Sequence, residues 1–196
     1  MVQWLYLASS YQNFQRFERL TTETVLASGV RDDTARMASS SSSSSAGLTA
    51  TSLFCCGNNT EGQLGLGDNA HRNTFTAVPP LPDGKVAKQV VPGSFHTMIL
   101  ADDGTVFACG DNADGELGLG DNDNRNTFTA VPPLPDGKVA KQMVAGNGHT
   151  MILAEDGTVF TCGRNVFGQL GLGDDDNRNT FTAVPPLPDG KVAKQV

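Results

Sequence analysis

One stretch of eighteen residues occurs three times in this chain without a single change. The copies occupy residues 72–89, 125–142 and 178–195, so equivalent residues lie 53 positions apart. A fixed period of this length is typical of propellers, solenoids and other arrays built from one repeated unit. The repeat therefore predicts a fold in which each unit buries apolar surface against its neighbour.

Each unit contains four short strand candidates separated by turn signals. In the first unit they are residues 75–78, 86–91, 97–101 and 105–109. Two prolines end the first run, and Pro-Asp-Gly and Asp-Asp-Gly supply turns. The run at 97–101 is almost continuously apolar, which is typical of a strand covered on both faces. Four antiparallel strands joined by tight turns form a propeller blade, with units predicted at 74–110 and 127–163.

A long segment without strand signals separates each fourth strand from the next first strand. These segments end at residues 73, 126 and 179, and they open with Gly57, Gly110 and Gly163. Each contains two leucines that alternate with glycine, and the first leucines of the three pairs are Leu64, Leu117 and Leu170. We expect the leucines to insert between blades, because glycine permits a close backbone approach.

The first 52 residues lie outside the repeats, which occupy residues 53–196. Residues 1–36 form a leader, and residues 37–52 form a serine-rich linker with seven consecutive serines. Aromatic residues at three-residue spacing allow a short amphipathic helix over roughly residues 10–27, which would dock a partner. The alternative is a poorly ordered leader whose removal leaves stability unchanged.

Composition limits the possible partners and compartments. The net charge is −7 and no basic stripe exists, which argues against direct nucleic-acid binding. No apolar run is long enough for a membrane helix, and no basic residue precedes the apolar start as in a secretory signal. Cys55, Cys109 and Cys162 follow the repeat period, which favours buried thiols and an intracellular setting, cytoplasmic or nuclear.

The repeated positions resemble the regulator of chromosome condensation repeat. The resemblance covers residues 54–196 and is clearest in the second copy. There it consists of Cys109-Gly110-Asp111-Asn112, Gly115, Leu117-Gly118-Leu119-Gly120-Asp121, Arg125, Phe128-Thr129-Ala130-Val131-Pro132, His149-Thr150 and Asp156-Gly157-Thr158-Val159-Phe160. It implies a β-propeller, which in this family usually has seven blades.

The chain departs from that family pattern in its number of units. Only two full four-strand units are expected, with one strand before them and two after. We therefore predict an all-β fold that is a partial propeller of about three blades, open rather than a closed seven-bladed ring. Because open sheet edges promote pairing, such a chain, if complete, is expected to self-associate or to be only partly folded.

Several residues that recur at the repeat period are expected to be structural. His96 and His149 precede a strand, and we expect each to bond the backbone of its blade because buried polar groups need partners. No nucleophile or acid is spaced around them as in a catalytic triad, so the chain is not expected to be an enzyme. Invariant Arg72, Arg125 and Arg178 are expected to form inter-blade ion pairs with an aspartate such as Asp121.

The long segments also contain the positions that differ between copies. Variation on an unchanged frame suits a binding surface, and drift explains it equally well. The candidate partner-binding residues are Glu61, Asp111, Asp114, Glu116, Arg164 and Phe167. A weaker alternative is calcium binding by Asp121, Asp123, Asp174 and Asp176, which lack the ordered spacing of a calcium loop.

Two functions remain open from the sequence. The first is a protein-interaction propeller, for which the resemblance implies guanine-nucleotide exchange on a small GTPase such as Ran. The second is a calcium-stabilised repeat module or a propeller fragment without its own activity. No cofactor is expected for either.

Overall fold

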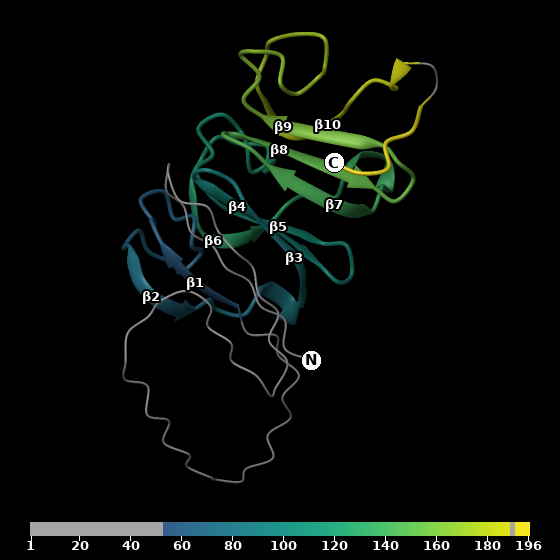
Figure 1. The fold of residues 1–196 in the computed structure, drawn as a ribbon. Helices are drawn as coiled ribbons and strands as arrows, with labels where there is room; N and C mark the ends of the chain where they lie inside the picture. Colours follow the sequence, from purple (N-terminus) through teal and green to yellow (C-terminus); the bar gives the residue numbers. More distant parts are fainter. Residues whose placement is uncertain (1–52, 189–190) are drawn as a thin grey trace, which may run out of the picture.

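The computed structural model describes residues 53–188 and 191–196. Ten strands form three antiparallel sheets that follow one another along the molecule (Figure 1). This confirms the all-β, partial-propeller fold predicted from the repeats. The predicted leader helix and the linker lie outside the described residues.

The second and third sheets have four strands each, and the first has two. The first sheet pairs β1 (Phe54–Gly57) with β2 (Arg72–Ala77). The second contains β3 (Ala87–Pro92), β4 (His96–Ala101), β5 (Val106–Gly110) and β6 (Arg125–Ala130). The third contains β7 (Ala140–Ala145), β8 (His149–Ala154), β9 (Val159–Gly163) and β10 (Arg178–Ala183). None of the described helices is long and apolar enough to cross a bilayer.

The predicted unit boundaries were wrong by one strand. The strand that begins with Arg72 pairs with β1 before it, not with β3 after it, and β6 likewise pairs with β5. The long segments therefore lie within a sheet, between β1 and β2, between β5 and β6, and between β9 and β10. The proline-rich connections after β2 and β6, which include the short 3-10 turns Pro82–Gly84 and Pro135–Gly137, carry the chain to the next sheet. Prolines cannot donate ladder hydrogen bonds, so this connection cannot continue a strand.

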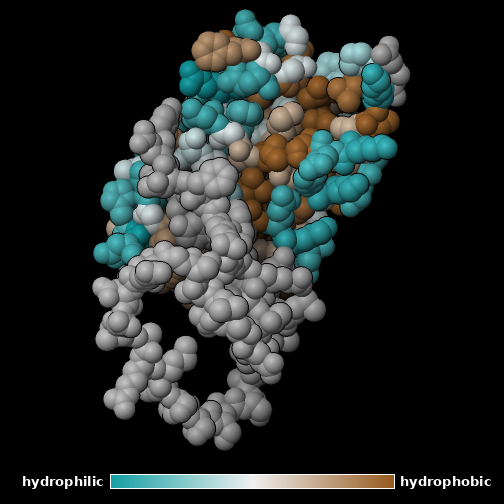
Figure 2. Space-filling view, viewed as in Figure 1, coloured by the Kyte–Doolittle hydropathy of each residue, from teal (hydrophilic) through white to brown (hydrophobic). Residues whose placement is uncertain are grey.

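Apolar side chains on both faces of the second sheet hold the three sheets together. Met98 and Leu100 of β4 belong to a cluster shared with the third sheet, and Ile99 and Ala101 belong to a cluster shared with the first. The alternation follows from the two-residue period of a strand. The prediction that this apolar run is covered on both faces is confirmed. In the space-filling view, hydrophobic residues form a band bordered by hydrophilic ones (Figure 2).

A glutamine side chain joins β3 to β7, which are edge strands of the second and third sheets. Gln89 of β3 donates from Nε2 to the Met143 carbonyl at 3.1 Å, and its Oε1 accepts the Met143 N–H at 3.2 Å. Gln142 repeats the first of these contacts with the Val196 carbonyl at 3.2 Å. The Gln89 amide therefore pairs with both backbone groups of Met143, as a residue of a neighbouring strand would, and so connects two separate sheets.

We expect Leu100→Ala to lower the free energy of unfolding by about 2–5 kcal/mol, because it leaves a cavity between the second and third sheets. Urea denaturation of the full chain measures the change. Val139→Ala removes a half-exposed side chain and is expected to change stability by about 0.5 kcal/mol or less. Equal losses in both variants would contradict the assignment of the core.

Candidate functional site

Three long loops, between β1 and β2, β5 and β6, and β9 and β10, form one face of the molecule. We call it the long-loop face and define it as residues 58–71, 111–124 and 164–177. Hydrogen bonds link each loop to the next. Asn124 Nδ2 donates to Glu61 Oε2 at 2.9 Å, and Asn177 Nδ2 donates to Asp114 Oδ1 at 2.8 Å. The hairpin turns between β4 and β5 and between β8 and β9 lie at the opposite strand ends, on the other face.

One buried asparagine organises each loop. In the second loop, Asn112 Oδ1 accepts the Leu117 N–H at 3.0 Å, and Asn112 Nδ2 donates to the Asp121 carbonyl at 2.9 Å. The Asn112 N–H in turn donates to Asn124 Oδ1 at 2.9 Å. Asn59 and Asn165 make the same contacts in their loops, with His71 in the place of Asn124 in the first loop. A single residue thus fixes both ends and the middle of each loop.

The repeated arginines stabilise the same loops from outside. Arg125 Nη2 lies 2.6 Å from Asp121 Oδ2, and Arg72 and Arg178 pair identically with Asp68 and Asp174. Each ion pair joins the first residue of a strand to the aspartate four residues before it in the loop of the same sheet, so the predicted inter-blade pairing was wrong although Asp121 is the partner of Arg125. The pKa of Asp121 lies below its usual range, first because its carboxylate accepts the Asp123 N–H and also because of Arg125.

The loops also bond to the next sheet. Thr97 Oγ1 donates to the Gln63 carbonyl at 2.8 Å, and Thr150 Oγ1 donates to the Glu116 carbonyl at 2.8 Å. Cys109 and Cys162 direct their thiols to the same two carbonyls. Leu64 and Leu117 are buried in the clusters between sheets, and Leu170 is buried in its own loop. The first two loops are therefore part of the junctions between sheets as well as part of the surface.

The two predicted structural histidines lie behind the loops. His96 is fully buried and its Nε2 lies 3.0 Å from Thr150 Oγ1 in the next sheet. The expected backbone bond is therefore replaced by a hydroxyl contact between sheets. Nδ1 of both His96 and His149 is buried without a hydrogen-bond partner among the described residues. Burial lowers the pKa of His96 to about 4, and His149 contributes to that shift, so His96 is neutral at physiological pH.

The predicted partner-binding residues separate into two groups. Glu61, Asp111, Asp114, Arg164 and Phe167 reach the loop surface, although Glu61 and Asp114 also bond the next loop. Phe167 is 84% exposed, and the Arg164 guanidinium lies 5.9 Å from the centre of its ring. Figure 2 shows a hydrophobic group protruding among hydrophilic residues at the top of the view, where this loop lies in Figure 1.

Glu116 is the exception, because its residue is only 2% exposed and lies beneath the loop surface. It occupies the place of Gln63 and Gln169, and its Oε2 accepts the Asp114 N–H at 2.9 Å as their Oε1 atoms accept the equivalent N–H. Burial raises the pKa of Glu116 to about 7, and the nearby Asp111 and Asp114 carboxylates contribute. The sequence signal for this internal position was the repeat period, because Glu116 lies 53 residues from both Gln63 and Gln169.

The calcium candidates do not gather into a site. The carboxylates of Asp121 and Asp174 are engaged by arginine, by the buried asparagine and by backbone N–H groups. Within residues 53–188 and 191–196, no group of three or more His, Cys, Asp or Glu residues is arranged to hold a metal ion.

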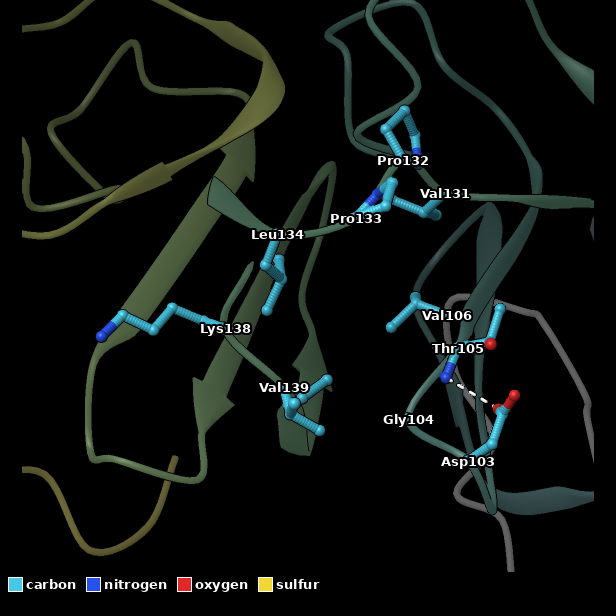
Figure 3. Close-up of a pocket in the computed structure, with 11 residues that line it drawn as sticks. Asp103, Gly104, Thr105, Val106, Val131, Pro132, Pro133, Leu134, Lys138 and Val139 are labelled. Atoms are coloured by element: carbon cyan, nitrogen blue, oxygen red, sulfur yellow. Dashed lines mark hydrogen bonds between the residues drawn. The ribbon is translucent and has the colours of Figure 1, made fainter. Parts of the chain in front are cut away.

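A recurring pocket lies on the face opposite the loops. It is lined by the β4–β5 hairpin, by the connection Val131-Pro132-Pro133-Leu134 and by residues that lead into β7. Figure 3 shows valine and leucine side chains around it, while Asp103 accepts the Thr105 N–H at 3.0 Å. An equivalent pocket recurs 53 residues later. The mainly apolar lining carries no convergent set of acids, bases or nucleophiles.

Comparison with known proteins identifies the repeat that builds this face. The family model of the regulator of chromosome condensation (RCC1) repeat matches residues 52–100, 103–153 and 156–195, and a second model of the same repeat matches residues 87–116 and 140–169. The chain belongs to the RCC1 repeat family. The resemblance inferred from the sequence is confirmed.

Several relatives share these repeats over a part of their length. The chain is 41% identical over 125 residues to the mouse X-linked retinitis pigmentosa GTPase regulator, and 40% identical over 133 residues to the bovine secretion-regulating guanine nucleotide exchange factor. These matches span 64% and 66% of this chain but 12% and 28% of the two relatives.

Solved structures of RCC1 propellers share the fold. Prp20p from Saccharomyces cerevisiae, whose structure was described together with its binding to Gsp1p and histones, matches with a TM-score of 0.60 and 25% identity. The match covers 68% of this chain and 34% of Prp20p. Human WBSCR16 has a TM-score of 0.58 over 67% of this chain and 38% of its own, with 22% identity, so it supports the fold alone.

The buried Glu116 carboxyl predicts a pH dependence that its glutamine variant removes. Its folded pKa lies above the usual value of 4.5, so the folded chain retains this proton between about pH 4.5 and 7 while the unfolded chain loses it. The contribution of Glu116 to stability therefore falls as the pH rises through that range and then stays constant. We expect Glu116→Gln to raise the free energy of unfolding at pH 8 by about 1–2 kcal/mol.

The test is the difference between Glu116→Gln and the unaltered chain, measured by urea denaturation from pH 5 to pH 8. The difference is needed because His96 acts in the opposite sense: its lowered pKa makes stability rise as the pH increases from about 4 to its ordinary value of 6.5. We expect the stability difference to be small at pH 5 and largest at pH 8. A difference that does not change with pH would contradict the buried, protonated state.

Proposed function

We propose that the long-loop face binds a protein partner and that this partner is a small GTPase whose nucleotide exchange the chain promotes. The observation that carries the proposal is the position of the charge. The segments 57–73, 110–126 and 163–179 hold ten acidic and four basic residues, a net −6 of the −7 on the whole chain. The rest of the chain has nearly balanced charge, so a field of one sign is directed from the loops.

The repeated arginines are already counted in this total and offset only part of the acidic charge. Arg72, Arg125 and Arg178 are engaged by carboxylates of their own loops. Asp123, Asp175 and Asp176 are exposed at the loop tips. A partner with a basic surface would be steered to this face, since complementary charge raises the rate of encounter.

An exposed aromatic residue provides a candidate anchor within the acidic face. Phe167 projects beside Arg164 and Val166, and large aromatic side chains often carry much of the binding energy at protein interfaces. The first two loops have Glu61 and Asp114 at this position. The third loop is therefore expected to contact the partner differently from the others.

The relatives support the choice of a small GTPase as the partner. One is named as a GTPase regulator and another as a guanine nucleotide exchange factor, and Prp20p was characterised for binding to Gsp1p. Exchange by this route requires no catalytic side chain of the chain itself, because a partner that binds the nucleotide-free GTPase more tightly shifts its equilibrium. No observation favours the calcium alternative.

The test measures the release of labelled GDP from Ran, with binding to Ran measured separately. We expect the chain to accelerate release and the double variant Asp123→Lys, Asp175→Lys to reduce that acceleration at least about tenfold, because it reverses the charge at the loop tips. The matched control Asp102→Lys, Glu155→Lys makes the same charge change in hairpins of the opposite face and should retain activity. Binding without faster release would contradict exchange and leave the interaction surface supported; absence of both would contradict the whole proposal.

A further inference from the structure

The turn between β7 and β8 contains the single Asn-Gly pair of the sequence, Asn147-Gly148. Asn147 is exposed, and Gly148 has a positive φ of 76°. Asparagine is among the chemically labile residues, and a following glycine places no side chain in the way of its own backbone nitrogen. The equivalent turn between β3 and β4 has Ser94 and Phe95 at these positions, so this chemistry is restricted to one turn.

The groups that would react are not engaged in hydrogen bonds. Within the described part of the chain, neither the Asn147 side-chain amide nor the Gly148 N–H has a hydrogen-bond partner. Both are therefore available to each other, and neither has to break a contact of the fold first.

The asparagines of the long-loop face differ in this respect, because the side chain of each one makes a hydrogen bond. They are Asn58, Asn59, Asn69, Asn112, Asn122, Asn124, Asn165 and Asn177. Asn73 and Asn126 lie within β2 and β6, and each precedes a threonine, whose branched side chain hinders approach to the backbone nitrogen. Asn147 thus combines exposure, an unengaged amide and a glycine neighbour.

We propose that Asn147 is a site of spontaneous deamidation, in which the backbone nitrogen of Gly148 displaces the amide nitrogen of the Asn147 side chain. The inference rests on the turn itself and is independent of the proposed exchange function.

The reaction requires water alone as a co-reactant. The Gly148 nitrogen loses its proton to solvent and bonds to the side-chain carbonyl carbon of Asn147, which closes a succinimide ring. The bond from that carbon to the amide nitrogen breaks, and this nitrogen takes up a proton and leaves as ammonia. Water then opens the ring at either of its two carbonyl carbons and gives aspartate or isoaspartate. One water is consumed and one ammonia is released, without oxidation or reduction.

The turn is bonded to the third long loop, so the isoaspartate product is expected to disturb that loop. The Gly148 carbonyl accepts the Arg164 N–H at 2.7 Å, and a Cβ on Gly148 would lie 3.6 Å from Arg164 Cβ and 3.5 Å from Asp114 Oδ2. In isoaspartate the backbone passes through the side chain of residue 147 and gains a carbon atom before Gly148. We therefore expect faster hydrogen exchange at the Arg164 N–H in the aged chain; unchanged exchange there would contradict this consequence.

The experiment incubates the full chain at neutral pH and follows its peptides by mass spectrometry, with enzymatic methylation to detect isoaspartate. We expect the peptide that contains residue 147 to gain the mass difference between an amide and an acid, and isoaspartate to appear in the same peptide. Peptides with Asn73 and Asn126 serve as controls within the molecule and should keep their mass. No gain at residue 147, an equal rate at the control asparagines, or a gain without isoaspartate would overturn the proposal.

Two variants and an unfolded reference separate the turn from the rest of the chain. Asn147→Ser, which has the side chain found at residue 94, should abolish the reaction. Asn147→Gln keeps an amide but requires a larger ring, so it should react far more slowly. Circular dichroism checks that both are folded.

The unaltered chain unfolded in guanidinium gives the rate without the fold. Because the fold leaves the reacting groups unengaged, we expect the native and unfolded rates at Asn147 to be similar. A native rate far below the unfolded rate would show that the fold protects Asn147 and would contradict the proposal.

Discussion

The arrangement of the described structure depends on one buried asparagine in each long loop. Asn59, Asn112 and Asn165 each replace missing backbone hydrogen bonds within a loop that has no regular secondary structure. Burying that much irregular backbone is costly unless its polar groups are paired. Because the asparagine satisfies them, each loop keeps a fixed shape and buries a leucine, and the first two loops offer a carbonyl and a glycine to the next sheet.

The same loops therefore connect stability and binding. Their inner side makes the junctions between sheets. Thr97 and Thr150 donate hydrogen bonds to loop carbonyls, and the rings of Phe128 and Phe181 lie against loop glycines. The segments that contain these loops carry nearly all of the formal net charge of the chain, and exposed acids such as Asp123, Asp175 and Asp176 lie on their outer side. A change at the surface can be made without altering the frame, as the replacement of Asp114 by Phe167 between the second and third loops illustrates. A change inside is transmitted to the neighbouring sheet.

The exact repeat made the fold class, most strands and the two-sided burial of β4 predictable from the sequence. It did not reveal whether the strand beginning with Arg72 pairs with the strand before it or with the strand after it. The repeat period is the same wherever the unit is taken to begin, so the period cannot decide between them. The assumption that a long loop separates blades led to the wrong choice. The loop joins adjacent strands because its asparagine folds it back, and that contact depends on three-dimensional proximity to Asp68, Asp121 or Asp174. The internal position of Glu116 was open to inference from its glutamine counterparts, whereas its pKa required the burial seen in the structure.

Hydrogen exchange of Asn112→Ala in the full chain tests the central role of the loop asparagine most directly. The account predicts faster exchange at the Leu117 N–H, which loses its acceptor, and in β8 and β9, which bond the carbonyl of Glu116, with protection retained in the first sheet. Asp123→Ala, at an exposed position of the same loop, should leave protection unchanged. Unchanged exchange at Leu117 and in β8 and β9 of Asn112→Ala would contradict the account.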